Sequence, residues 1–165
     1  MATTARDVMK TEVRTVSPDI SLTDLEKLFI DNRVTGFPVV ESERLVGIVS
    51  RSDIVRKIVT EQSYAEYVSD YYRDVGSFDE PRPADTLPEL GSQIGSRLAS
   101  ATVRDVMSQE PVTVSADDPV SRVAEQLVER RIHRVPVVAS DGRLEGIITS
   151  LDLVALFAEN RVAPR

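Results

Sequence analysis

Residues 131–152 read RIHRVPVVASDGRLEGIITSLD, and this stretch decides the fold. It contains two β-rich runs, 135–138 and 144–149, separated by a turn that includes Asp141 and Gly142. Aspartate bonds its own backbone in turns, and glycine adopts a positive φ without a steric penalty. The stretch therefore predicts a β-hairpin.

After the hairpin, apolar residues move to helical spacing from Leu151 onward. Thr149 and Asp152 lie three residues apart at this junction. A helix N-terminus offers free N–H groups that suit an anion, and a carboxylate beside it can accept hydrogen bonds from a diol. Threonine and aspartate also cap helices routinely. A ligand site and a plain helix cap are therefore both open interpretations of the junction.

The same stretch occurs earlier in the chain, as RVTGFPVVESERLVGIVSRSD over residues 33–53. Ser50 takes the place of Thr149. The lead-in sequence Arg-Asp-Val-Met at 6–9 recurs at 104–107, 98 positions later, and the final aspartates lie 99 positions apart. The second hairpin is thus one residue longer. An ordered match of this length indicates a duplicated unit.

Each copy predicts the order strand, helix, strand, strand, helix, so the fold class is α/β (α+β), with two units packed about a pseudo-twofold axis. In the first copy the predicted elements are a capped turn at 6–9, a strand at 13–16, a helix at 21–32, strands at 37–41 and 45–50, and a helix from Ser52. In the second they are a turn at 102–107 capped by Thr102, a strand at 112–114, a helix with Pro119 as first residue, the hairpin, and a helix that frays near Asn160. The predicted domains are 1–62, 63–100 and 101–165.

The predicted insertion between the copies holds all four tyrosines, at helical spacing over 64–75, followed by a connector rich in proline and glycine over 77–100. The tyrosine stripe has two interpretations. It packs on its own fold, or it forms a homodimer or partner surface, where tyrosine is enriched.

The formal net charge of −7 is unevenly distributed. Residues 1–60 carry no net charge, 61–100 carry −5 and 101–165 carry −2. There is no basic stripe for duplex nucleic acid. No apolar run is long enough for a membrane helix, the start lacks the pattern of a signal peptide, and there is no cysteine for disulfides or thiolate catalysis. We therefore expect a cytoplasmic protein without membrane contact.

The chain resembles the tandem cystathionine-β-synthase (CBS) domain pair. The resemblance rests on both Arg-Asp-Val-Met lead-ins, on the strands Phe-Pro-Val-Val at 37–40 and Val-Pro-Val-Val at 135–138, and on the junctions at 47–53 and 146–152. Both junctions are similar to the family's signature Gly-x-x-(Ser/Thr)-x-x-Asp. Only residues from about 64 to 100 fall outside the resemblance.

The resemblance implies a cleft between the copies that binds an adenosine compound such as AMP, ADP, ATP or S-adenosylmethionine, with no other cofactor. The aspartates, Asp53 with Ser50 and Asp152 with Thr149, are expected to take the ribose hydroxyls, and charge-assisted hydrogen bonds of this kind are strong. The remaining expected ligand-binding residues are Arg51, His133, Arg134, Val135, Pro136, Gly36, Phe37, Pro38 and Val13.

A basic pair at His133-Arg134 often faces phosphates in this family, whereas the first copy has Thr35-Gly36. Arg51 partly compensates there. His133 also suits the C-terminus of the preceding helix, where a cation is favoured. As the only histidine, it cannot build a histidine-rich metal site.

Three functional hypotheses follow. The first is a regulatory module that senses an adenosine compound and acts on another protein, because the chain has no effector domain. The second is a structural module that dimerises with an empty cleft. The third, a small enzyme, lacks a plausible catalytic triad or phosphate loop. No catalytic or metal-binding residue is therefore predicted.

Overall fold

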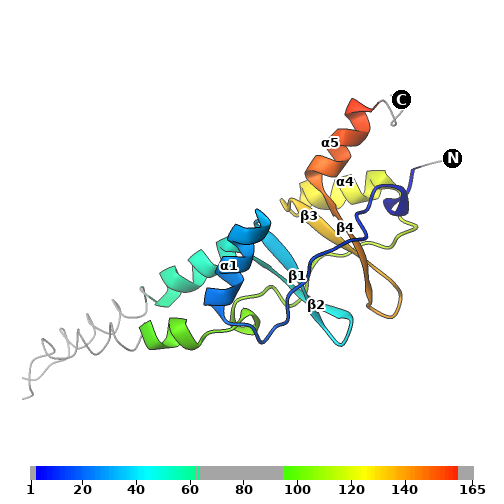
Figure 1. The fold of residues 1–165 in the computed structure, drawn as a ribbon. Coiled ribbons are helices and arrows are strands. Elements are labelled where there is room, and N and C mark those ends of the chain that lie inside the picture. Colours follow the sequence, from blue (N-terminus) through cyan, green and yellow to red (C-terminus); the bar gives the residue numbers. More distant parts are fainter. Residues whose placement is uncertain (1–2, 62, 64–94, 160–165) are drawn as a thin grey trace, which may run out of the picture. The chain divides into compact units, whose positions relative to one another are not determined.

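The computed structural model describes residues 3–61, 63 and 95–159, so most of the predicted tyrosine stripe and connector lies outside the described residues. The named elements in chain order (Figure 1) are η1 (Ala5–Asp7), α1 (Leu22–Asn32), β1 (Gly36–Glu41), β2 (Arg44–Ser50), η3 (Val103–Asp105), α4 (Val120–Glu129), β3 (Arg134–Val138), β4 (Leu144–Thr149) and α5 (Ser150–Ala158). Two further helical stretches cover 51–61 and 95–100. The predicted mixed fold with a duplicated helix–hairpin–helix order is confirmed.

The two hairpins form two separate two-stranded sheets, β1–β2 and β3–β4. The first turns through Ser42 and Glu43, with φ angles of 50° and 65°, although neither residue is glycine. Two successive positive φ angles are typical of the type I′ turn that suits strand twist. The second hairpin has a register shift between Val137 and Val138, and Gly142 adopts a φ of 82°.

The prediction of strands at 13–16 and 112–114 was wrong. Each is reduced to a single parallel bridge, Val16 with Val39 and Val114 with Val137. A longer parallel ladder would need the next N–H of the hairpin strand, and that residue is proline in both copies. Proline has no N–H to donate, so the ladder ends after one bridge.

Side-chain caps fix the starts of most helical elements. Ser21 accepts the N–H of Asp24 at 3.1 Å and begins α1, as predicted. Thr4 and Thr102 form matching capping boxes with the acidic residue three positions later. Pro119, predicted as the first residue of its helix, is instead the N-cap of α4, with a ψ of 145°.

The described chain divides into two compact units. The first comprises Met1–Ser17, Phe37–Ile48 and Ser108–Arg165, and it places the lead-in of the first repeat on the second repeat. The N–H of Ala5 donates to the carbonyl of Asp118 at 2.8 Å, and Lys10 and Ile147 exchange two main-chain hydrogen bonds of 3.0 Å. The buried core of this unit comprises Ala5, Val114, Ala116, Val123, Leu127, Val135, Val137, Ile148, Leu153 and Leu156.

The second unit comprises Pro18–Gly36 and Val49–Met107. Here the lead-in of the second repeat pairs with the first repeat, because the N–H of Val103 donates to the carbonyl of Ile20 at 3.0 Å. Leu22, Leu25 and Phe29 are the buried residues of α1. Glu61 is also buried and binds Lys57 at 2.8 Å, with Arg97 at 3.7 Å.

Gly146 lets the first lead-in lie directly on β4. A Cβ atom at this position would sit 2.8 Å from Sδ of Met9 and 3.0 Å from the carbonyl oxygen of Lys10. The methionine side chain can move, but the carbonyl is held by its hydrogen bond to Ile147. The close approach therefore requires glycine.

We expect Gly146→Ala to lower the free energy of unfolding by about 1–3 kcal/mol, because the lead-in must shift away from β4. Gly95→Ala is the matched control, since Gly95 is helical and has nothing within 4 Å of the added carbon. That control should be neutral or slightly stabilising. Urea unfolding of both variants checks this, and equal stability of the two would contradict the close approach at Gly146.

Candidate functional site

The second signature forms a complete helix cap at the start of α5. Oδ2 of Asp152 accepts the N–H of Thr149 at 2.8 Å and also accepts its hydroxyl hydrogen bond. In return, the Thr149 hydroxyl oxygen accepts the N–H of Asp152 at 3.3 Å. The other carboxylate oxygen, Oδ1, lies 2.7 Å from Nζ of Lys10. The two oxygens of Asp152 thus have different roles.

These contacts keep Asp152 ionised. Its side chain is only 11% exposed. Burial raises the pKa of Asp152, but the hydrogen bonds from Lys10 and Thr149 outweigh burial and bring the pKa below that of an ordinary aspartate. The site therefore presents a half-buried carboxylate that is charged at neutral pH.

The first signature repeats this arrangement with different partners. Oδ2 of Asp53 accepts the N–H of Ser50 at 2.8 Å and its hydroxyl at 2.7 Å. Oδ1 accepts a hydrogen bond of 3.1 Å from the Arg56 guanidinium. The Asp53 side chain is 8% exposed. In both repeats, one carboxylate oxygen belongs to the cap and the other faces a cation.

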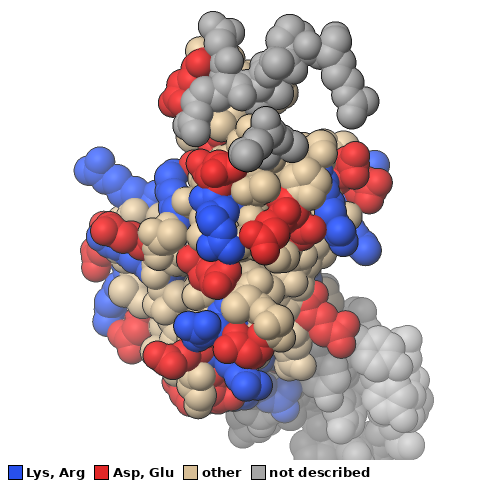
Figure 2. Space-filling model, turned by 90° about the vertical axis from the view of Figure 1, so that its right-hand side faces the viewer, with Lys and Arg blue, Asp and Glu red and all other residues tan. Residues whose placement is uncertain are grey.

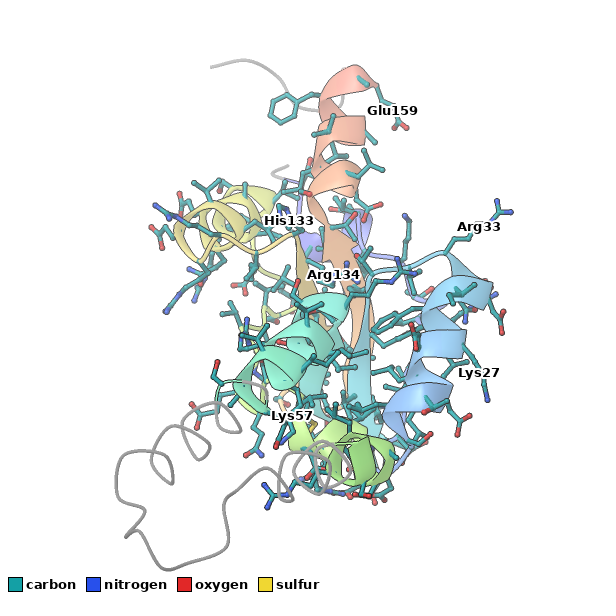
Figure 3. All side chains as sticks on the ribbon, turned by 90° about the vertical axis from the view of Figure 1, so that its left-hand side faces the viewer. Lys27, Arg33, Lys57, His133, Arg134 and Glu159 are labelled. Carbon is teal, nitrogen blue, oxygen red and sulfur yellow. The ribbon has the colours of Figure 1, made fainter. Side chains whose placement is uncertain are left out.

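A main-chain hydrogen bond ties each signature to the entry of its own hairpin. The N–H of Ser150 donates to the carbonyl of His133 at 3.0 Å, and in the first repeat the N–H of Arg51 donates to the carbonyl of Thr35 at 3.1 Å. Arg134 is the cross-strand partner of Thr149. Because directly opposed residues point to one face of a sheet, Arg134 lies on the same face as Thr149. Figure 3 labels His133 and Arg134 at the start of β3.

The basic residues near the two signatures differ in their environment. His133 is exposed, whereas Arg134 is half-buried and burial lowers the pKa of its guanidinium. Arg51 is exposed, and its guanidinium carbon lies 5.7 Å from the centre of the Phe29 ring, within cation–π distance. The Arg51 side chain therefore has an aromatic contact in its own unit.

The apolar residues that the sequence predicts as ligand contacts are buried. Phe37 and Val135 are at most 2% exposed, and Pro38 and Pro136 are among the fully buried side chains. Gly36 begins β1 and is also buried. Val135 belongs to the core of its unit. These residues support the hairpins, and their contact with a ligand stays a prediction.

Hollows lie next to two of the predicted site residues. Val13 lines a hollow of about 240 Å³ in the first unit, together with Thr11, Thr15, Val40, Glu43, Arg143 and Leu144. Asp53 lines a hollow of about 160 Å³ in the second unit, together with Arg56, Lys57, Thr60, Asp105 and Val106. The second hollow places Asp53 beside two cations, and the ligand contact predicted for Val13 stays a prediction.

Lys10 is the functional candidate that the sequence did not reveal. It lies 142 positions before Asp152, and its counterpart in the second repeat is Ser108, so neither motif nor repeat pointed to it. Lys10 could have been found only by knowing that the first lead-in lies on the second repeat. The main-chain pairing of Lys10 with Ile147 shows this arrangement. Arg56 was missed as well, although its i+3 spacing from Asp53 is readable in the sequence.

Charges of both signs alternate on the face shown in Figure 2, with no continuous basic area on it. Within 3–61, 63 and 95–159, no group of three or more histidine or acidic residues is placed to hold a metal ion. No helix in the same residues has the length and apolar character needed to span a bilayer.

Comparisons with known proteins agree with the duplicated architecture. The model of the CBS domain matches residues 5–60 and 103–159. An uncharacterized protein of Methanocaldococcus jannaschii, MJ1426, is 33% identical over 90% of this chain and 88% of its own length. The chloroplastic CBS domain-containing protein CBSX1 of Arabidopsis thaliana is 30% identical over 88% of this chain, which spans 59% of that relative.

Two enzymes also match over a small part of their length. An inosine-5′-monophosphate dehydrogenase of Korarchaeum cryptofilum is 25% identical, and this chain spans 22% of it. A homoserine O-acetyltransferase of Methanohalobium evestigatum is 23% identical, and this chain spans 24% of it. The matched regions are therefore minor parts of those enzymes.

Solved structures with the same fold include CBSX2 in complex with AMP, which is 26% identical, with a TM-score of 0.65 over 96% of this chain and 98% of that one. The CBS domain pair of protein MJ0100, solved with 5-methylthioadenosine and S-adenosylmethionine, is 23% identical, with a TM-score of 0.65 over 97% of this chain and 99% of that one. The second likeness concerns the fold alone.

The lowered pKa of Asp152 predicts a pH-dependent contribution to stability. A carboxyl group whose pKa is lower when folded stabilises the protein above its unfolded pKa and loses this effect as the pH falls through the folded pKa. We expect Asp152→Asn to cost about 1–3 kcal/mol at neutral pH and clearly less at about pH 3. Urea unfolding of the unaltered protein and of Asp152→Asn at both pH values checks this. All other carboxylates are common to the two proteins, so their contribution cancels in the difference. Parallel pH profiles would refute the role of the ionised group.

Proposed function

Because the chain belongs to the CBS domain family, we propose that it is a regulatory module that binds an adenosine-containing ligand at its signature aspartates. The candidate ligands are AMP, ADP, ATP and S-adenosylmethionine. The AMP complex of CBSX2, 26% identical to this chain, supports the adenosine class. In this proposal Asp53 and Asp152 accept hydrogen bonds from the ribose hydroxyls.

One observation carries the proposal: in both carboxylates, one oxygen caps a helix and the other contacts a cation. A helix cap needs only one oxygen, and Oδ2 serves it in Asp53 and in Asp152. In each case Oδ1 faces an exposed cation instead of a further backbone group. An ionised oxygen with such a partner can exchange it for the hydroxyls of a diol, which a purely structural cap does not require.

The regulatory part of the proposal concerns a separate target protein. A ligand regulates only when it binds two states of the module with different affinity, and the difference is then transmitted to whatever recognises one of them. The matching enzymes, in which the similar region is a small part, support a regulatory role over an enzymatic one. The target, the cytoplasmic location and the homodimer stay predictions.

A second candidate is a dimerisation module that acts without a ligand. It is favoured by the apolar side chains that α5 leaves exposed: Leu151 at 72%, Val154 at 59% and Phe157 at 66%. The equivalent helix over 51–61 exposes Val55, Ile58 and Val59 in the same way. Exposed apolar groups at helical spacing are typical of association surfaces.

The ligand hypothesis predicts stabilisation by at least one adenosine compound. At about 100-fold its dissociation constant, a ligand adds roughly 2.7 kcal/mol, which raises the melting temperature of such a chain by some 5–10 °C. We expect the shift to shrink in Asp152→Ala or Asp53→Ala, according to which site binds. Thermal unfolding with AMP, ADP, ATP and S-adenosylmethionine measures it.

Asp117→Ala is the matched control for this experiment, because the Asp117 side chain is exposed and forms a surface ion pair with Arg6. Its ligand-induced shift should equal that of the unaltered protein. Absence of a shift with every compound, confirmed by calorimetric titration, would reject the ligand hypothesis. Release of phosphate from ATP would instead support the enzyme hypothesis.

The dimerisation hypothesis predicts that Val154→Ser with Phe157→Ser reduces the mass in solution from twice the chain mass to the chain mass. The physical reason is the loss of apolar area from the association surface. Sedimentation equilibrium measures this, with Ile30→Ser as control because Ile30 is equally exposed on α1. A monomeric unaltered protein, or a dimer that survives the double substitution, would contradict this hypothesis.

A further inference from the structure

The ammonium of Lys10 already occupies the oxygen that a ribose would need. Oδ2 of Asp152 is engaged by Thr149, and Oδ1 lies 2.7 Å from Nζ of Lys10. Each carboxylate oxygen has two lone pairs, so Oδ1 can accept one more hydrogen bond while Lys10 stays. A diol that donates two hydrogen bonds to this side of the carboxylate must therefore displace the ammonium.

Lys10 can leave Asp152 without any change in the backbone. Its N–H and carbonyl are both paired with Ile147 at 3.0 Å, so its Cα position is fixed on β4. Its side chain is 66% exposed and carries the ammonium on a flexible four-carbon stem. Rotation of that stem moves the charge by several ångströms while the lead-in stays in place.

Displacement has different consequences for different ligands. A neutral nucleoside breaks the ion pair between Lys10 and Asp152 and offers the ammonium no new partner. A nucleotide breaks the same pair but brings a phosphate that the ammonium can bind, together with Arg134, which lies on the face of Thr149. S-adenosylmethionine carries a sulfonium and an ammonium against a single carboxylate, so its net positive charge opposes binding next to Lys10 and Arg134.

We propose that Lys10 is a specificity-determining residue of the second signature, which makes that site select phosphorylated adenosine compounds over adenosine and over S-adenosylmethionine. This inference rests on the proposed function and narrows it to one ligand class. It assigns the ammonium two positions: on Asp152 in the absence of ligand and on the ligand phosphate in its presence.

The first signature differs in a way that isolates the role of Lys10. The repeat counterpart of Lys10 is Ser108, whose main chain pairs with Ile48 and whose side chain carries no charge. The cation on Asp53 is Arg56, from the helix that follows the signature itself. Substitution of Lys10 therefore alters the second site and leaves the ion pair of Asp53 in place.

Isothermal titration of the full chain with AMP, adenosine and S-adenosylmethionine tests the proposal. We expect the unaltered protein to bind AMP most tightly. In Lys10→Met, the ratio of AMP affinity to adenosine affinity should fall about tenfold, because AMP loses one charge-assisted hydrogen bond while adenosine no longer competes with an ion pair. Lys10→Arg, which keeps the charge, should retain most of the preference.

The control is Arg6→Met, which removes a neighbouring cation that pairs with Asp117 at 3.3 Å on the surface of the same lead-in. It should leave the affinity ratio unchanged. A second readout is salt: sodium chloride should weaken AMP binding less in Lys10→Met than in the unaltered protein, because one ionic contact is gone. A merely structural role of Lys10 would change stability but neither the ratio nor this salt dependence.

The outcomes distinguish failure of the specificity proposal from failure of the proposed function. If AMP and adenosine bind and Lys10→Met leaves their affinity ratio unchanged, the specificity proposal is wrong and the proposed function stands. If none of the three compounds binds the unaltered protein and neither ADP nor ATP binds it, the proposed function fails and the specificity proposal fails with it. Circular dichroism of Lys10→Met verifies that the variant is folded when either result is obtained.

Discussion

The candidate site is organised by the signature aspartates, in which the two carboxylate oxygens have different partners. In each repeat, the signature aspartate begins a helix with one oxygen and holds a cation with the other. The first contact fixes the position of the group, and the second places an opposite charge beside it. A buried carboxylate without that cation would carry an uncompensated charge, which is costly. Helix capping and the proposed ligand recognition thus involve the same side chain.

Much of the fold was predictable because local chemistry and repetition agreed. The helix predicted at 21–32, the β-branched hairpin strands and the junctions at Ser50 and Thr149 all lie where the sequence indicates. The duplication allowed each copy to support the interpretation of the other. The helix-capping interpretation of the signature is confirmed, since Oδ2 performs it in both repeats, and the ligand interpretation stays a prediction.

The errors came from contacts between distant parts of the chain. The strand expected at 13–16 is one bridge, because Pro38 cannot donate to a longer ladder. The cation on Asp152 comes from Lys10, which no local pattern links to it. The residue after the Arg-Asp-Val-Met motif is lysine in the first copy and serine in the second. Comparison of the two copies therefore did not indicate that this position supplies a cation to the site. Pairing across 137 positions is decided by the fold and not by neighbouring residues.

The pairing of Lys10 with Ile147 also orders events during synthesis. The first lead-in leaves the ribosome early, but β4, on which it lies, is made more than a hundred residues later. Until then, Met9 and Val8 have no native surface to cover them, and such exposed segments invite association with other chains. Contacts of this sequence separation also slow folding, because loop closure precedes any gain from packing. The first lead-in therefore reaches its native place only after β4 has been made.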